Sequence, residues 1–254
     1  MIDLASLKKC DLHTHTTYCD GKNTAEEMVL SAIEKGLDTI GIATHSFTEG
    51  DNWCIKKEDI PRFQAEVNGL KEKYKDKIRV LCGVEQDYLS DCSIYGFDYS
   101  IGSVHFFKVN GKIRHVDYSE EYLLDTINEL FSGDVYSAVE DYYQNVGNVI
   151  EKTGADVIGH FDLICKFNEG NKIFDVHHPR YVKAYTTALE KLLKTGKPFE
   201  INSGAISRGY RLEPYPHKDI LKTIKESGGK FILSSDAHNA KNVAYQFDIW
   251  QKLL

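Results

Sequence analysis

Residues 24–45 read TAEEMVLSAIEKGLDTIGIATH, a helix pattern followed at once by a buried-strand pattern. Thr24 is a typical helix N-cap and Glu27 completes a capping box, so a helix is predicted over 24–35 with Gly36 as its stop. The apolar run 39–44 has the length of a strand that is buried on both faces. His45 closes this run, so the strand ends in a side chain that can bind metal.

The same alternation of strand and helix continues along the chain. Helical patterns occupy 180–194 and 219–227, and two further helices between 119 and 152 are separated by a break at 132–134. Strands that alternate with helices form βαβ units and a mainly parallel sheet. The predicted strands cover residues 9–13, 39–44, 78–85, 99–105, 156–160, 198–202 and 230–235.

Polar side chains stand at the carboxyl end of every predicted strand. In an α/β barrel the active-site groups gather at this end of all strands, whereas an open doubly wound sheet concentrates them where the strand order reverses. The even distribution favours a TIM-like α/β barrel, one strand short of the usual eightfold form. A doubly wound open sheet is the alternative.

Length and composition set the remaining limits. The 254 residues fit one large domain over 1–254, and the hydrophobic share of 42% is enough to bury a core. No apolar stretch approaches the roughly 18 residues of a membrane helix, and the first residues do not resemble a signal sequence. We therefore expect a cytoplasmic protein without a membrane partner. The net charge of −7 excludes a broad basic face for duplex nucleic acid.

The six cysteines contain no CxxC pair, which argues against a zinc ribbon, and the absence of an export signal favours reduced thiols over disulfides. The histidines are more informative, because six of the ten stand at strand ends. His13 and His15 are two residues apart, and such residues point to the same side of an extended chain. The histidines at strand ends are His13, His15, His45, His105, His160 and His238.

Single members of this set have ordinary explanations. His45 alone is best explained as a core histidine, and Asp20 in the Cys19-Asp20-Gly21 turn suits turn chemistry. Glu85 is harder to explain by packing, because a buried unpaired carboxylate costs several kcal/mol or a large pKa shift. Taken together with Asp236, the set predicts a metal site.

The candidates are too numerous for one tetrahedral zinc ion and suit two or three ions that share a carboxylate. Their mixture of nitrogen and oxygen donors is typical of zinc, manganese or iron. The predicted ligands are His13, His15, Asp20, His45, Glu85, His105, His160, Asp236 and His238.

These motifs resemble those of the polymerase and histidinol phosphatase (PHP) superfamily. The similar segments are DLHTH (11–15), ATHS (43–46), GVE (83–85), GSVH (102–105), GHFD (159–162) and SSDAH (234–238). The segment EINSGAISRGY (200–210), with EPYP at 213–216, is similar to the histidinol-phosphate phosphatase branch.

The resemblance implies a distorted (βα)7 barrel with three divalent ions. It also implies which ligands would hold each ion: His13, His15, Glu85 and Asp236 the first, Glu85, His105 and His160 the second, and Asp20, His45 and His238 the third. The implied activity is hydrolysis of L-histidinol phosphate to L-histidinol and phosphate, a step of histidine biosynthesis.

For the mechanism we expect a water bound between two ions to lose a proton near neutral pH and attack phosphorus as metal-bound hydroxide. Glu85, Asp236 and His238 are the predicted catalytic residues, with Asp236 or His238 protonating the leaving oxygen. Arg208 is the candidate phosphate contact, since its planar fork suits phosphate, although a solvated loop arginine is the alternative.

Two further residues are predicted to bind substrate. Asn202 ends a strand and Asp162 follows His160 by two residues, so each is placed near the pocket. The alternatives are a turn or cap for Asn202 and the orientation of a ligand histidine for Asp162. His115, His177, His178 and His217 are expected at the surface or in loops.

Two other functions compete with this one. The first is a PHP phosphoesterase that acts on nucleotides or other small phosphate esters. The second is a non-catalytic domain that binds metal and regulates a partner. We expect a small-molecule phosphate ester as the partner and no nucleic acid, and the sequence does not indicate an oligomeric state.

Overall fold

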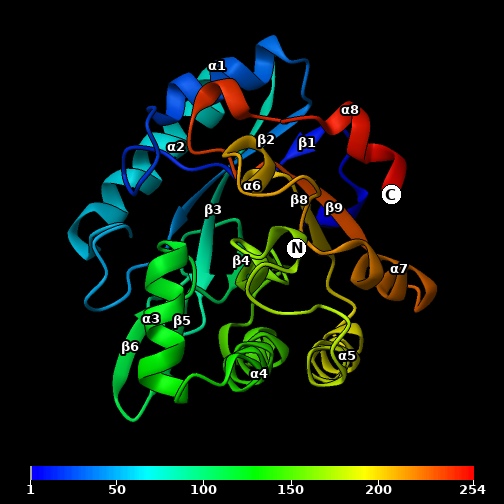
Figure 1. Cartoon of the computed structure of the whole chain (residues 1–254). Helices are drawn as coiled ribbons and strands as arrows, with labels where there is room; N and C mark the ends of the chain where they lie inside the picture. Colours follow the sequence, from blue (N-terminus) through cyan, green and yellow to red (C-terminus); the bar gives the residue numbers. More distant parts are fainter. Residues whose placement is uncertain (1) are drawn as a thin grey trace.

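The computed structural model describes residues 2–254, and a parallel seven-stranded sheet forms its centre (Figure 1). None of these strands extends more than two residues beyond its predicted range. The strands are β1 (Cys10–Asp11), β2 (Thr39–His45), β3 (Arg79–Asp87), β4 (Tyr99–Ser103), β7 (Val157–Ile158), β8 (Phe199–Asn202) and β9 (Phe231–Ser234).

The sheet closes on itself just beyond its two end strands. The strand order is β1-β2-β3-β4-β7-β8-β9, and every neighbouring pair is parallel. An isolated parallel bridge joins Thr14 to Ala237, with the His15 amide donating to the Ala237 carbonyl at 2.9 Å. The predicted α/β barrel is therefore confirmed, and the open sheet is excluded.

Most helices lie around the barrel and connect its strands (Figure 1), whereas α8 (Phe247–Trp250) follows the last strand, β9. The other helices are α1 (Ala25–Glu34), α2 (Ile60–Tyr74), α3 (Glu120–Phe131), α4 (Val135–Thr153), α5 (Pro179–Leu193), α6 (Gly204–Ser207) and α7 (Lys218–Glu226). Short 3-10 turns occupy Leu4–Ser6, Lys57–Asp59, Leu163–Cys165, Glu169–Asn171, Ala240–Asn242 and Gln251–Leu253.

The helix ends follow from local chemistry. The Thr24 hydroxyl accepts from the Glu27 amide, and the Glu27 carboxylate accepts from the Thr24 amide at 2.8 Å, which confirms the capping box. Ser132 and Gly133 have φ values of 54° and 81°, and Asp134 then caps α4. The predicted break between α3 and α4 therefore lies where the sequence indicates it.

Side chains alternate along each strand between the barrel interior and the surrounding helices. Ile40 and Ile42 of β2 pack outward with α1 and α2, whereas Ala43 belongs to the interior cluster. Gly41 is required in this strand because a Cβ there would overlap the Tyr99 hydroxyl inside the barrel. The same alternation turns His45 toward the interior, at the carboxyl end.

A β-hairpin after β4 is absent from the sequence prediction. Its strands, β5 (Phe106–Val109) and β6 (Lys112–His115), pair antiparallel through a turn at Asn110 and Gly111. Both turn residues have positive φ, 49° and 79°, as an Asn-Gly hairpin turn requires. The hairpin begins directly after His105, so it stands at the edge of the barrel's carboxyl end (Figure 1).

Two expectations about the chain as a whole can be compared with the structure. Within residues 2–254, no helix combines the length and the apolar character needed to cross a membrane. The six cysteines are all free thiols.

Candidate metal centre

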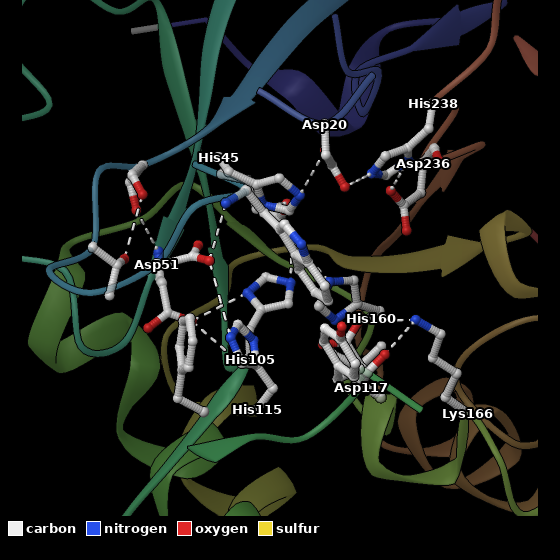
Figure 2. Close-up of a pocket in the computed structure, with 18 of the residues that line it drawn as sticks. Asp20, His45, Asp51, His105, His115, Asp117, His160, Lys166, Asp236 and His238 are labelled. Atoms are coloured by element: carbon white, nitrogen blue, oxygen red, sulfur yellow. Dashed lines mark hydrogen bonds and ion pairs between the residues drawn. The ribbon is translucent and has the colours of Figure 1, made fainter. Parts of the chain in front are cut away.

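The nine predicted ligands converge at the carboxyl end of the barrel. Figure 2 labels Asp20, His45, His105, His160, Asp236 and His238 among them. Each of the nine has a ring nitrogen or carboxylate oxygen no more than 3.4 Å from such an atom of another member. The set comprises His13, His15, Asp20, His45, Glu85, His105, His160, Asp236 and His238.

Glu85, at the carboxyl end of β3, lies at the centre of the cluster. Its Oε1 is 2.8 Å from His160 Nε2 and 3.3 Å from His105 Nε2. Its Oε2 is 2.9 Å from His45 Nδ1 and 3.2 Å from His13 Nε2. Because each oxygen faces a different pair of imidazoles, the carboxylate has the arrangement of a bridging ligand.

Asp20 forms the opposite edge of the cluster. Its Oδ1 is 3.5 Å from His45 Nε2, and its Oδ2 is 3.1 Å from His238 Nε2. The His15 ring stacks against both imidazoles, with centroid distances of 4.2 Å to His45 and to His238. The turn that carries Asp20 therefore places a carboxylate against ligands from β2 and from the segment after β9.

Three groups of donor atoms are compact enough for one ion each, with all atoms of a group within 4.8 Å of one another. His15 and His45 each belong to two groups, so these two rings lie between neighbouring sites. The groups are His13, His15 and Asp236; His45, Glu85 and His105; and His15, Asp20, His45 and His238.

The buried atoms of the cluster fit bound cations. His13 Nε2, His15 Nε2 and Glu85 Oε2 are buried and make no hydrogen bond. Although His13 Nε2 and Glu85 Oε2 are only 3.2 Å apart, their geometry is not that of a hydrogen bond. A buried polar atom without a partner costs about 1–3 kcal/mol. Imidazole nitrogens and carboxylate oxygens suit divalent zinc, manganese or iron, which would satisfy these atoms.

The electrostatics of the cluster favour metal-binding protonation states at some ligands and oppose them at others. Burial raises the pKa of Glu85, but His13 and His105 outweigh it and hold that pKa well below its usual range. Burial holds the pKa of His15 well below its usual value. At His13 burial is outweighed by Glu200 and Glu85, which raise its pKa well above the usual value. Protons therefore compete with metal at His13.

Two carboxylates that the sequence analysis missed orient the ligand histidines. Glu200 Oε1 lies 2.7 Å from His13 Nδ1, and its Oε2 accepts from the His160 amide at 3.0 Å. Asp87 Oδ2 lies 3.1 Å from His105 Nδ1. Such partners fix the tautomer and ring orientation of a metal-binding histidine. A signal was available for Glu200, because it is a charged residue inside a buried strand, as Glu85 is.

Arg208, the predicted phosphate contact, lines the cavity beside the metal ligands. Its Nη2 donates to Asp236 Oδ2 at 3.0 Å, and its Nη1 lies 3.0 Å from His238 Nδ1. Gly204 makes room for this pair, because a Cβ there would lie 2.8 Å from Asp236 and 3.0 Å from Arg208 Nη2. Asp236 has a φ of 49°, and local strain of this kind is typical of functional sites.

The other two predicted substrate contacts lie beneath the cavity. Asn202 is fully buried, and its amide donates to Glu200 Oε2 at 3.1 Å. Asp162 is also fully buried and accepts from the His217 amide at 2.9 Å and from Arg211 at 3.4 Å. Among residues 2–254, neither is part of the cavity lining. These positions indicate that Asn202 and Asp162 support the site and do not contact a ligand.

The cavity above the cluster has a volume of 320 Å³. His115, expected at the surface or in a loop, belongs to its lining. The expectation fails because the hairpin folds back, with the Val116 amide donating to the His105 carbonyl at 2.8 Å. His177 is exposed and His178 caps α5, so both lie away from the cluster as expected.

A family model described as the PHP domain matches residues 11–204, about three quarters of the chain. The chain belongs to the PHP domain family. The matched range contains seven of the nine predicted ligands, and only Asp236 and His238 lie beyond it. The bridge between Thr14 and Ala237 brings these two into the same centre of this PHP domain.

The PHP chain also resembles characterised proteins over nearly its whole length. The histidinol-phosphatase of Bacillus subtilis (strain 168) is 26% identical over 269 residues, which cover 95% of this chain and 98% of that protein. The histidinol-phosphatase of Lactococcus lactis is 28% identical over 252 residues, covering 92% of this chain and 86% of that protein.

Two solved structures share the fold of this PHP chain. The hisK protein of Listeria monocytogenes matches 95% of this chain and 100% of its own, with a TM-score of 0.83 at 24% identity. The histidinol phosphate phosphatase of Lactococcus lactis, solved with zinc, L-histidinol and phosphate, matches 98% of this chain and 94% of its own. Its TM-score is 0.65 at 23% identity, so the likeness supports the same barrel architecture.

Proposed function

We propose that this PHP chain is a metal-dependent phosphomonoesterase that hydrolyses L-histidinol phosphate to L-histidinol and phosphate, a step of histidine biosynthesis. The observation that carries the proposal is the buried cluster of metal-competent side chains beside Arg208, at the open end of the barrel. Two relatives that align with more than nine tenths of this chain are named histidinol-phosphatases, which supports the choice of substrate. We further propose that residues 1–254 act as one domain.

The donor set suggests three divalent ions, which we propose to be zinc, manganese or iron. Zinc is the first to test, because the Lactococcus structure contains it. When bound, the ions supply a water of lowered pKa and offset charge on the phosphoryl oxygens. The proposed ligand sets are His13, His15, Glu85 and Asp236 for the first ion, Glu85, His105 and His160 for the second, and Asp20, His45 and His238 for the third.

The chain's own residues have distinct roles in this proposal. Arg208 offers a planar fork of donors to the phosphate oxygens, and its contact with Asp236 holds the guanidinium at the cavity. Glu85 keeps neighbouring ligands at a fixed separation through its two oxygens. Of the two predicted donors of the leaving-group proton at this cavity, Asp236 is held ionised, because Arg208 and His13 outweigh burial and keep its pKa well below the usual value, so we assign the role to His238.

Asn202 and Asp162 act as supports in this proposal. Asn202 holds Glu200, which in turn holds His13. Asp162 binds the segment that leads into α7, through the amide of His217. Asn202 and Asp162 therefore influence substrate binding indirectly, by fixing the positions of other residues.

The test is phosphate release by the zinc-loaded and manganese-loaded protein from three esters: L-histidinol phosphate, adenosine 5′-monophosphate and glycerol 2-phosphate. Protein treated with a chelator is the control. We expect L-histidinol phosphate to have the highest kcat/KM, and the chelator to abolish turnover. Faster turnover of the nucleotide would assign the chain to the nucleotide phosphoesterases. Bound metal without turnover of any ester would indicate the non-catalytic alternative.

A further inference from the structure

One side of the cavity takes no part in the metal centre. Four rings form it, and we call them the aromatic wall: Trp53, Phe106, His115 and Tyr118. Asp51 lies beside the wall, on the side of the cavity away from Asp236 (Figure 2). The wall comes from the segment after β2 and from the β5–β6 hairpin with the residues that follow it. These segments are separate from those that carry Arg208 and Asp236.

The aromatic wall is an ordered arrangement of rings. Trp53 and Tyr118 are parallel, with an interplanar angle of 5° and a centroid distance of 5.4 Å. His115 packs against Trp53 at 4.8 Å and against Phe106 at 4.5 Å. Tyr118 nevertheless leaves 56% of its surface exposed at the cavity. A stacked aromatic surface that faces a polar cavity offers a flat contact for a planar or cationic group.

Charge on this side of the cavity is negative. The Asp51 side chain is only 8% exposed, and its Oδ1 accepts from the Trp53 amide at 3.1 Å. His115 Nε2 lies 4.0 Å away, but burial lowers the pKa of His115, so its ring is neutral at neutral pH. The adjoining Asp117 is already paired with Lys166 at 3.0 Å. The charge of Asp51 is therefore left for a cation.

One nitrogen of His115 has no partner within the protein. His115 Nδ1 is buried and makes no hydrogen bond, although its ring lines the cavity. Buried polar atoms are normally satisfied by protein, water or ligand. Because Nδ1 is closed to solvent, a ligand in the cavity would meet the ring of His115 and not this atom.

We propose that the aromatic wall and Asp51 form the subsite for the leaving alcohol, and that this subsite selects an alcohol that carries a planar, nitrogen-bearing ring and a cationic amine. This inference rests on the proposed phosphatase activity and deepens it. Asp51 repels phosphate and attracts an ammonium or imidazolium group, while Arg208 attracts the phosphate at the other end. A substrate with an anionic phosphate at one end and a cation at the other is thereby held in a single orientation. L-Histidinol phosphate has this chemistry, and glycerol phosphate lacks the cation.

Binding can be measured without turnover. The chain has two tryptophans, so Trp250→Phe leaves Trp53 as the single fluorescent reporter. We expect L-histidinol to change Trp53 emission saturably in the zinc-loaded protein, and glycerol to leave it unchanged. Asp51→Asn should weaken L-histidinol binding at least about tenfold, since it removes the charge but keeps the shape. Asp91→Asn is the matched control, because the Asp91 side chain is 89% exposed. Calorimetry on the protein with both tryptophans provides the same comparison.

Kinetics provide the second measurement. Asp51→Asn should lower kcat/KM at least about tenfold for L-histidinol phosphate and leave that for glycerol 2-phosphate within about threefold. The absence of saturable L-histidinol binding, or equal losses on both esters, overturns the subsite. Saturable binding that depends on Asp51, in a protein that does not hydrolyse L-histidinol phosphate, overturns the proposed function and supports the subsite.

Discussion

Replacing Glu200 with glutamine tests how a buried carboxylate that is not itself a predicted ligand controls the metal centre. In the native protein one oxygen faces His13 Nδ1 at 2.7 Å, and the other accepts from the His160 amide at 3.0 Å. When His13 donates its Nδ1 proton to Glu200, the lone pair on Nε2 faces the cluster. Glutamine keeps the shape but replaces one accepting oxygen with a donating amino group. At least one of the contacts that Glu200 makes with His13, the His160 amide and the Asn202 side chain is therefore lost.

The expected size follows from the kind of contact that changes. Hydrogen bonds to a charged partner contribute about 1.5–3 kcal/mol, and neutral ones about 0.5–1.5 kcal/mol. The substitution therefore removes about 1–2 kcal/mol from the orientation of His13, and roughly 1.4 kcal/mol corresponds to a tenfold change. Zinc affinity should fall about tenfold, within the range of about 10–100-fold seen for residues that orient metal ligands.

The assay is a competition for zinc between the protein and a chromophoric chelator at neutral pH. Glu190→Gln is the matched control, since Glu190 is an exposed carboxylate on α5. Thermal melting of each metal-free variant separates a change in metal binding from a change in folding. Native zinc affinity in folded Glu200→Gln protein would refute the argument, because the carboxylate would then have no influence on His13.

Three further predictions concern the same centre. Glu85→Gln should lower turnover at least about 100-fold with loss of bound zinc. The reason is that it removes the charge that faces four imidazoles, those of His13, His45, His105 and His160. A native zinc stoichiometry and a native rate would exclude the bridging role of Glu85. Zinc affinity should fall as pH drops below about 7, because carboxylates raise the pKa of His13 and His105 despite burial, and a protonated ring cannot bind metal. Calorimetry in buffers of different ionisation enthalpy should show proton release on zinc binding, and an affinity that is constant from about pH 5 to 7 contradicts this prediction. Zinc at about 100 times its Kd should stabilise the fold by about 2.7 kcal/mol and raise Tm by several degrees in a thermal melt, whereas an unchanged Tm means that zinc does not bind the native state.

Local patterns were enough to predict the barrel and the positions of its candidate ligands. Strand length, capping and glycine stops are short-range signals, so the strands and the helix beginning after Thr24 lie close to their predicted ranges. The strand ends then placed the candidate ligands together, apart from Asp20 in its turn, because parallel strands bring their carboxyl ends to one side. Their roles as ligands stay predictions until metal is bound.

The features that were missed depend on contacts between distant segments. Glu200 approaches His13 from 187 positions along the chain, a partnership that no local pattern encodes. His115 lines the cavity only because the hairpin folds over His105. The Asn110-Gly111 dipeptide is a local signal for that hairpin, and it is sufficient to predict the turn.

Anomalous scattering from crystals grown with zinc and phosphate tests the central claim most directly. The account predicts three peaks among the nine converging side chains, each about 2.0–2.2 Å from imidazole nitrogens or carboxylate oxygens. Glu85 should contact two of the ions, and the phosphate should lie between the ions and Arg208. Peaks confined to the protein surface, or phosphate bound away from the cluster, would contradict the account.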